Sequence, residues 1–132
     1  MIRKISAAYD INLAEAKKTN PEDYESFNEF FTRALAPGVR PITGEPHAIA
    51  SPADGYLSQR GAVLEGKIIQ AKGFHYDVRT LLGGDASRAT PFERGHFLTI
   101  YLSPKDYHRL HMPLRGELRE MIHVPGRLFS VN

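Results

Sequence analysis

Residues 96–113, His-Phe-Leu-Thr-Ile-Tyr-Leu-Ser-Pro-Lys-Asp-Tyr-His-Arg-Leu-His-Met-Pro, contain a regular strand pattern followed by a turn that is rich in titratable side chains. Within residues 96–102, Leu98, Ile100 and Leu102 fall on one face of an extended chain, which predicts a β-strand. The prolines that bound residues 104–113 predict that the strand ends in a turn. This stretch therefore predicts a β-rich region in which a strand leads directly into a polar turn.

Short strand patterns separated by turn residues continue on the N-terminal and C-terminal sides of this stretch. Residues 48–52 lead into an Asp54-Gly55 turn, residues 77–82 have a helical pattern, and residues 83–95 are expected to form a loop. The predicted strands are residues 56–61, two strands within residues 63–70 that flank Glu65-Gly66, and residues 116–123.

The first 38 residues have helical patterns instead. We expect a short amphipathic helix over residues 1–9 and a further helical turn or two over residues 13–18. A clearer helix is predicted to begin after Asn20, a good N-cap, with Pro21 in its first position, and to end before Pro37-Gly38. Its apolar stripe consists of Tyr24, Phe27, Phe30, Phe31, Ala34 and Leu35.

This order of elements predicts an α+β fold, with N-terminal helices followed by an antiparallel or mixed β-sheet that forms an incomplete sandwich or barrel-like domain. We expect a helical region over residues 1–38, for which contact with a membrane is one of two interpretations, and a partial β-rich catalytic domain over residues 39–132. The chain stops as an apolar segment begins at residues 128–131, which would leave a sheet edge unpaired. We therefore expect the chain to be one piece of a larger protein.

The composition is typical of an ordinary globular domain, since 42% of the 132 residues are hydrophobic and 24% are charged. Lys and Arg exceed Asp and Glu by 17 to 15. The resulting charge of +2 permits attraction to phosphates or to an anionic bilayer without requiring either, and we expect no nucleic-acid partner. The absence of cysteine excludes disulfides and thiolate chemistry. No apolar run approaches the roughly 18 residues that a membrane-spanning helix needs.

The polar turn places His108 and His111 close to Asp106, which indicates proton chemistry near neutral pH. Three interpretations remain open. Both rings can be structural, with their nitrogens satisfied by backbone groups. They can bind a metal, although the chain offers no cysteine and no His-Glu-x-x-His, so we expect no metal site. Finally, one ring can be a base oriented by a carboxylate, with Asp54 as the candidate, as in sites that activate a serine or threonine hydroxyl.

Phe27, Phe30 and Phe31 also have two interpretations. Most stripes of this kind are the buried face of an amphipathic helix. The alternative is contact with lipid, because a helix that carries phenylalanines near basic residues can lie at a bilayer interface. The pattern favours the first interpretation and leaves the second open.

Several segments of the chain resemble the phosphatidylserine decarboxylases, specifically the bacterial membrane-associated type. They occur in the order typical of that family and cover nearly the whole chain from about residue 10 onward. Each is a weak signal by itself, whereas the ordered set is highly specific. The segments are Ser26-Phe27-Asn28-Glu29-Phe30-Phe31-Thr32-Arg33, Ser51-Pro52-Ala53-Asp54-Gly55, Gln70-Ala71-Lys72-Gly73, residues 101–113, and Arg119-Glu120-Met121 through Val124-Pro125-Gly126 to Phe129-Ser130-Val131-Asn132.

The resemblance implies a proenzyme that cuts itself at a Gly-Ser bond and converts the new N-terminal serine into a pyruvoyl group on a small α chain. It gives Asp54 and His111 the roles of orienting carboxylate and base in that cleavage, and His108 a role in decarboxylation as proton donor or substrate-positioning group. The pyruvoyl group would form a Schiff base with phosphatidylserine and accept electrons as carbon dioxide leaves, giving phosphatidylethanolamine. No serine of this chain follows a glycine, so we expect the chain alone to be inactive.

The same resemblance implies the partners: phosphatidylserine, an anionic membrane surface, the missing C-terminal part with its α chain, and a second copy in a homodimer. Phe27, Phe30 and Phe31 would face the membrane or shape the lipid entrance. The expected location is peripheral, on the cytoplasmic side of the bacterial inner membrane. The alternative from another class is a non-catalytic peripheral lipid-binding module in which the histidines are structural.

Overall fold

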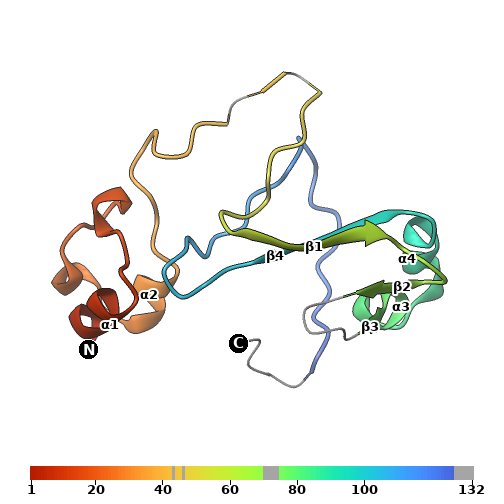
Figure 1. The fold of residues 1–132 in the computed structure, drawn as a ribbon, viewed down its shortest axis with the longest axis horizontal. Helices are drawn as coiled ribbons and strands as arrows, with labels where there is room; N and C mark the ends of the chain where they lie inside the picture. The colour runs from red at the N-terminus through yellow and green to blue at the C-terminus, as the bar shows by residue number, and fades with distance from the viewer. Residues whose placement is uncertain (43, 46, 70–74, 127–132) are drawn as a thin grey trace. The chain divides into compact units, whose positions relative to one another are not determined.

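The computed structural model describes residues 1–42, 44–45, 47–69 and 75–126. The chain forms two compact units, each built from two separate stretches of sequence. Met1–Tyr56 and Leu102–Gly116 form the first unit, and Leu57–Tyr101 and Glu117–Asn132 form the second. The described residues contain short helices and two two-stranded sheets joined by long irregular stretches, and no sheet among them closes into a barrel (Figure 1). The predicted α+β class is confirmed.

Short helical segments at the start of the chain surround the core of the first unit. They are α1 (Ile2–Ala8), the 3₁₀ turns η1 (Leu13–Glu15) and η2 (Pro21–Asp23), and α2 (Phe27–Phe31). Ile11, Tyr24 and Phe30 are buried together in this core. The Tyr24 ring meets the Phe30 ring edge-on, with centroids 5.5 Å apart, which is a favoured geometry for aromatic pairs. The helical patterns predicted over residues 1–9 and 13–18 are thus confirmed in shortened form.

The predicted continuous helix that begins at Pro21 is wrong. Asn20 does act as an N-cap, because its side-chain oxygen accepts a hydrogen bond from the Glu22 N–H at 3.2 Å. The helix that it caps is only the single turn η2, because Tyr24 already has extended backbone angles. One N-cap signal was identified correctly, but the element that follows it is much shorter than the apolar stripe indicated.

A second N-cap starts α2 one turn later. The Ser26 hydroxyl accepts a hydrogen bond from the Glu29 N–H at 3.1 Å, and the Glu29 carboxylate accepts one from the Glu25 N–H at 2.8 Å. This reciprocal pattern is similar to a capping box, in which a serine and a glutamate three residues later satisfy the free N–H groups of a helix start. Ser26 therefore divides the predicted helix into two pieces.

The second unit contains both sheets. Strand β1 (Tyr56–Ala62) pairs with β4 (His96–Tyr101), and β2 (Lys67–Ile69) pairs antiparallel with β3 (His75–Asp77). The helical segments between β3 and β4 are α3 (Val78–Leu81), α4 (Ala86–Ala89) and η4 (Thr90–Phe92). Val63, Val78 and Ala89 form the buried core of this unit.

Several predicted elements of the second unit are confirmed. The strands predicted at residues 56–61 and 96–102 correspond to β1 and β4, and the helix predicted at residues 77–82 corresponds to α3. The Glu65-Gly66 turn also forms, with positive φ angles of 51° and 70° that suit a tight hairpin. Leu64 and Lys67 pair across it.

Two other predictions for the second half of the chain are wrong. Residues 116–123 form no strand, and Leu118 and Met121 are 83% and 88% exposed because no strand within the described residues covers them. The predicted loop over residues 83–95 contains α4 and η4, because Asp85 provides an N-cap that the sequence pattern did not reveal. Residues 70–73 and 129–132, which belong to segments of the resemblance, lie outside the described residues.

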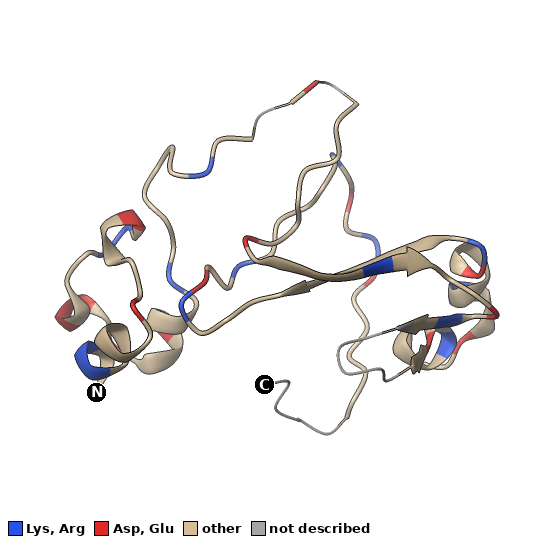
Figure 2. Cartoon of the chain, in the orientation of Figure 1, with Lys and Arg blue, Asp and Glu red and all other residues tan. Residues whose placement is uncertain are grey.

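Acidic and basic residues are interspersed along the described chain rather than gathered by sign (Figure 2). Arg3 pairs with Glu22 at 2.8 Å, and Arg88 with Glu120 at 3.3 Å. Exposed ion pairs of this kind contribute little to stability. Among the described helices, none has the length and apolar character that crossing a bilayer requires.

Candidate functional site

Two distant segments of sequence pair within the first unit. The Ala50 N–H donates to the Pro113 carbonyl at 3.0 Å, and the His111 N–H donates to the Pro52 carbonyl at 2.8 Å. An antiparallel bridge joins Asp54 to Tyr107. The backbone pairing thus brings the Asp54 turn beside the polar turn that was singled out in the sequence.

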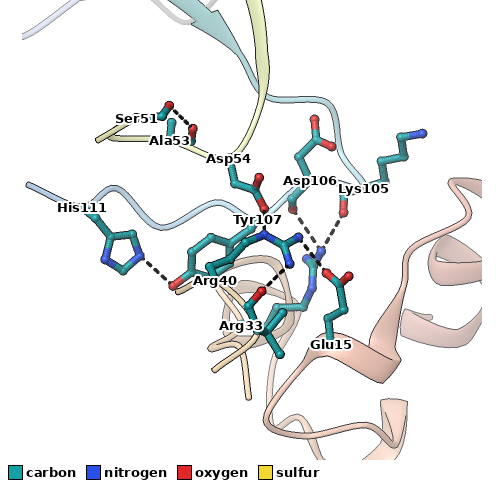
Figure 3. Close-up of polar contacts among 11 residues, drawn as sticks. Glu15, Arg33, Arg40, Ser51, Ala53, Asp54, Lys105, Asp106, Tyr107 and His111 are labelled. Atoms are coloured by element: carbon teal, nitrogen blue, oxygen red, sulfur yellow. Dashed lines mark hydrogen bonds and ion pairs between the residues drawn. The ribbon is translucent and has the colours of Figure 1, made fainter. Parts of the chain in front are cut away.

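The Asp54 carboxylate is held by Arg40. Arg40 Nε donates to Asp54 Oδ2 at 2.8 Å, and Arg40 Nη2 donates to Glu15 Oε2 at 2.8 Å (Figure 3). The hydrogen bond to Glu15 and then the one to Asp54 raise the pKa of Arg40 above its ordinary value, so the guanidinium stays charged. Arg40 binds Oδ2, and Oδ1 of Asp54 has no hydrogen-bond partner within the described residues.

Neither Arg40 nor Glu15 was identified as a site residue from the sequence. Arg40 lies in an irregular stretch, and Glu15 lies in the 3₁₀ turn η1, far from Asp54 along the chain. A lone basic residue in a loop carries no pattern from which its partners can be read. Only the fold reveals that one guanidinium joins these two carboxylates.

His111 is paired with Tyr107 rather than with Asp54. Its Nε2 lies 3.0 Å from the Tyr107 hydroxyl, and the two rings stack with centroids 5.6 Å apart and an interplanar angle of 23° (Figure 3). Within the described residues there is no hydrogen bond between the side chains of Asp54 and His111. The fold therefore places the two predicted residues on paired segments without joining their side chains, and Tyr107 is a neighbour that the sequence reasoning missed.

His108 has a different environment from His111. Its Nε2 lies 3.0 Å from the Ser103 carbonyl, which can only accept, so Nε2 carries the proton. Nδ1 has no hydrogen-bond partner in the part of the chain that the structure describes. Its ring stacks on that of Phe31, with centroids 4.0 Å apart and an interplanar angle of 23°. His108 is half-buried, whereas His111 is exposed.

Asp106, the acid nearest to the two histidines in sequence, organises the turn itself. Its carboxylate accepts hydrogen bonds from the Ser103 N–H at 2.6 Å and from the Ser103 hydroxyl at 2.8 Å. Its own N–H donates to the Ser103 carbonyl at 2.9 Å. Ser103 and Asp106 thus close a tight local turn of the kind that such polar residues favour, and the turn holds the carbonyl that His108 contacts.

Two arginines connect this turn to the end of α2. Arg33 is 4% exposed, and its Nη2 donates to the carbonyls of Lys105 and Asp106 at 2.7 Å and 3.0 Å. Arg109 Nε donates in the opposite direction, to the Thr32 carbonyl at 2.7 Å. Burial lowers the pKa of Arg33, and carbonyl acceptors offset part of the cost of burying its charge.

The three phenylalanines predicted to face a membrane lie on α2 in different environments. Phe30 is 0% exposed, so it belongs to the core of the first unit rather than to a lipid-contacting surface. Phe27 is 37% exposed, and Phe31 is half-buried and stacks on the Phe27 and His108 rings. Only Phe27 and Phe31 have exposed ring surface available for a lipid.

Comparison with known proteins supplies the context for this arrangement. The family model of phosphatidylserine decarboxylase matches residues 27–132. A protein of Bordetella pertussis named phosphatidylserine decarboxylase proenzyme is 58% identical over all 132 residues, which span 44% of that protein. Proteins with the same name from Methylococcus capsulatus and Pseudomonas putida are 55% identical over 132 residues and 59% identical over 124, spanning 46% and 43% of their lengths. The chain therefore spans less than half the length of these curated relatives.

Proposed function

The chain belongs to the phosphatidylserine decarboxylase family, and from this premise we propose that the complete protein converts phosphatidylserine to phosphatidylethanolamine and carbon dioxide. The structural observation that carries the proposal is the pairing of residues 50–54 with residues 107–113 in the first unit. This pairing places a carboxylate turn beside a two-histidine turn, which is a suitable arrangement for moving protons.

In the proposed self-cleavage, Asp54 and His111 act on a serine from the part of the protein outside this chain. The His111 ring accepts the proton of the serine hydroxyl as the serine oxygen attacks the preceding carbonyl carbon, and it gives that proton to the serine nitrogen as the peptide C–N bond breaks and an ester is left. The Asp54 carboxylate stabilises the imidazolium that forms, as in a Ser-His-Asp triad. Arg40 supports this role, because it fixes Oδ2 of Asp54 and leaves Oδ1 for the histidine.

A pyruvoyl group made from that serine is the cofactor that we propose for the decarboxylation. When bound, such a group supplies an electron sink for the electron pair released with carbon dioxide. The described residues fit this group through their chemistry, because His108 and His111 offer ring nitrogens that hold and transfer protons within one turn. Once it is protonated on both ring nitrogens, His108 would donate its Nδ1 proton to the amine-bearing carbon of the substrate, which has lost carbon dioxide.

The test is the mass of the product expressed from the complete reading frame. We expect two chains, of which the smaller begins with the mass of a pyruvoyl group in place of serine. The product should also release carbon dioxide from phosphatidylserine. A single uncut chain with no decarboxylase activity would contradict the proposal and favour a non-catalytic lipid-binding module.

The proposal includes a peripheral position on the cytoplasmic side of the bacterial inner membrane, where phosphatidylserine is the partner. The exposed part of the Phe27 ring on α2 supports contact with a bilayer interface. The complete protein should float with vesicles that contain anionic lipid, and Phe27→Ser should reduce the floated fraction. Phe92→Ser is the matched control, because Phe92 is also exposed but lies in the second unit. Equal flotation of both variants would contradict this part of the proposal.

A homodimer is part of the same proposal and rests on the family alone. Light scattering coupled to size exclusion should give twice the mass of one processed protein. A monomeric mass at micromolar concentration would contradict the dimer and leave the proposed chemistry unaffected.

A further inference from the structure

The stack of Phe31 on His108 joins two features that the sequence treats separately. Phe31 is the last residue of α2, and its ring lies 4.0 Å from the His108 ring between centroids, with an interplanar angle of 23°. The Phe27 ring also stacks on Phe31, with centroids 5.8 Å apart. A residue from the aromatic stripe therefore contacts a histidine that is proposed to act on the substrate.

Backbone contacts hold the two partners of this stack in place. The Arg33 side chain donates to the carbonyls of Lys105 and Asp106, which precede His108 in the chain. The Arg109 side chain, which follows His108, donates to the Thr32 carbonyl beside Phe31. The turn is thus fastened to the end of α2 on both sides of His108, so the stack is a contact between two fixed segments.

The hydrogen bond and the stack restrain different motions of the His108 ring. The bond from Nε2 to the Ser103 carbonyl fixes one corner of the ring at 3.0 Å. A single hydrogen bond still permits the ring to tilt about the line that joins its two atoms. The flat face of Phe31 removes that freedom, because tilting would separate the rings or drive them into contact. Together the two contacts fix the direction in which Nδ1 points.

We infer that Phe31 is a positioning residue, whose ring sets the plane of the His108 imidazole for the decarboxylation step. The inference rests on the proposed function, in which His108 acts in turnover, and it goes beyond the expected lipid contact of Phe31. Chemistry that depends on proton transfer needs its donor aligned with the reacting carbon, and small misplacements reduce the rate strongly.

The experiment uses the complete protein with Phe31 replaced by Leu, which keeps apolar bulk but removes the flat ring. We expect kcat for phosphatidylserine to fall about tenfold while KM changes less than about twofold, because alignment in the transition state is lost but binding is kept. Phe31→Tyr and Phe31→Trp keep a flat ring and should restore most of kcat. Phe92→Leu is the matched control, since it makes the same replacement at an exposed residue of η4 and should leave kcat unchanged.

Self-cleavage provides the internal comparison. Phe31 contacts neither Asp54 nor His111 among the described residues, so Phe31→Leu should be cut into two chains as completely as the unmodified protein. An unchanged kcat in Phe31→Leu would overturn the inference, and so would a rise in KM with kcat unchanged. An equal decrease of kcat in the Leu, Tyr and Trp variants would also overturn it. If the unmodified protein neither cleaves itself nor decarboxylates the lipid, the proposed function fails instead.

A spectroscopic measurement on the unmodified protein covers the case in which Phe31→Leu does not fold. A phenyl face stacked on an imidazole shifts the ring protons of the histidine upfield in the NMR spectrum. With labelled histidine, the His108 ring protons should lie upfield of those of the exposed His47 and His123. His108 protons at the positions of these exposed histidines would show that the stack is absent and would overturn the inference.

Discussion

His108 and His111 are three residues apart, yet their rings have different partners. The His111 ring is exposed and contacts the Tyr107 hydroxyl, whereas the His108 ring is half-buried between Phe31 and the Ser103 carbonyl. An exposed histidine beside the Asp54 turn is accessible to a chain segment that arrives from elsewhere in the protein. A half-buried, stacked histidine suits a fixed role toward a small reacting group.

Substitution should separate these two roles. His111→Ala should abolish self-cleavage, because the serine hydroxyl loses the base that accepts its proton. His108→Ala should still be cut but should lose turnover by a factor of roughly a hundred or more, the range typical of a lost general acid or base. Gel analysis reports the cleavage, and release of labelled carbon dioxide reports the turnover. The reverse pattern would show that the two assignments must be exchanged.

Phe30 is the residue on which the core of the first unit depends most. Its side chain is 0% exposed and contacts Tyr24 edge-on, so Phe30→Ala leaves a cavity. We expect a loss of about 3–5 kcal/mol in the free energy of unfolding, measured by urea denaturation of the complete protein. Phe92→Ala is the matched control, because Phe92 is 52% exposed, and it should change stability by less than about 1 kcal/mol. Equal losses in the two variants would mean that Phe30 is not in a folded core.

At the level of single elements, short helices in this protein are defined by their N-caps. Ser26, Asp77 and Asp85 each accept a hydrogen bond from a backbone N–H in the first turn of the helix that follows. The apolar pattern predicted where helical residues occur, but it joined η2 to α2, because an apolar stripe continues across a cap. It also missed α4, which has too few residues for a periodic pattern to be visible.

The N-cap of α3, Asp77, should make the stability of this helix depend on pH. Hydrogen bonds from Thr80 lower the pKa of Asp77 below its ordinary value of 3.8. A carboxylate with a lowered pKa stabilises the folded state above pH 3.8 and loses that contribution as the pH falls through its native pKa. We therefore expect protection of the Thr80 amide against hydrogen exchange to decrease with acidification below about pH 4.

Asp77→Asn separates the charge from the cap in the same experiment. An asparagine can still accept the hydrogen bond from the Thr80 N–H, but it does not titrate. The variant should keep Thr80 protected without the additional loss below pH 4 that the aspartate causes. The same acid-induced loss in both proteins, after correction for the intrinsic exchange rate, would show that Asp77 is not its source.

For the molecule as a whole, the sequence predicted local elements and the family better than it predicted the contacts between distant segments. The strand over residues 96–101, the Glu65-Gly66 turn and the family were identified correctly. The sequence did not predict that Arg40 binds two carboxylates, because Glu15 and Asp54 lie 25 and 14 residues away from it in the chain. Local patterns encode local structure, whereas contacts between distant segments depend on the fold.

The chain by itself exposes large apolar side chains in both units. Leu110 and Met112 are 73% and 67% exposed in the first unit, and Leu118 and Met121 are exposed in the second. Because the relatives are more than twice as long, we expect that residues outside this chain cover such surfaces in the complete protein. Residues 1–132 expressed alone should bind the dye ANS strongly and associate, and the complete protein should do neither. Weak dye binding by the isolated chain would contradict this expectation.

The binding of both Glu15 and Asp54 by Arg40 restricts which substitutions this protein can accept during evolution. If Arg40 is lost, Glu15 and Asp54 are both left without their shared partner, so a mutation at position 40 acts at three positions together. A neutral residue at position 40 should then be tolerated best when position 15 also loses its negative charge. Selection for survival of cells that carry Arg40→Gln, under conditions in which they need this protein, should therefore yield second-site changes at Glu15. We expect substitutions at these three positions to be coupled in evolution.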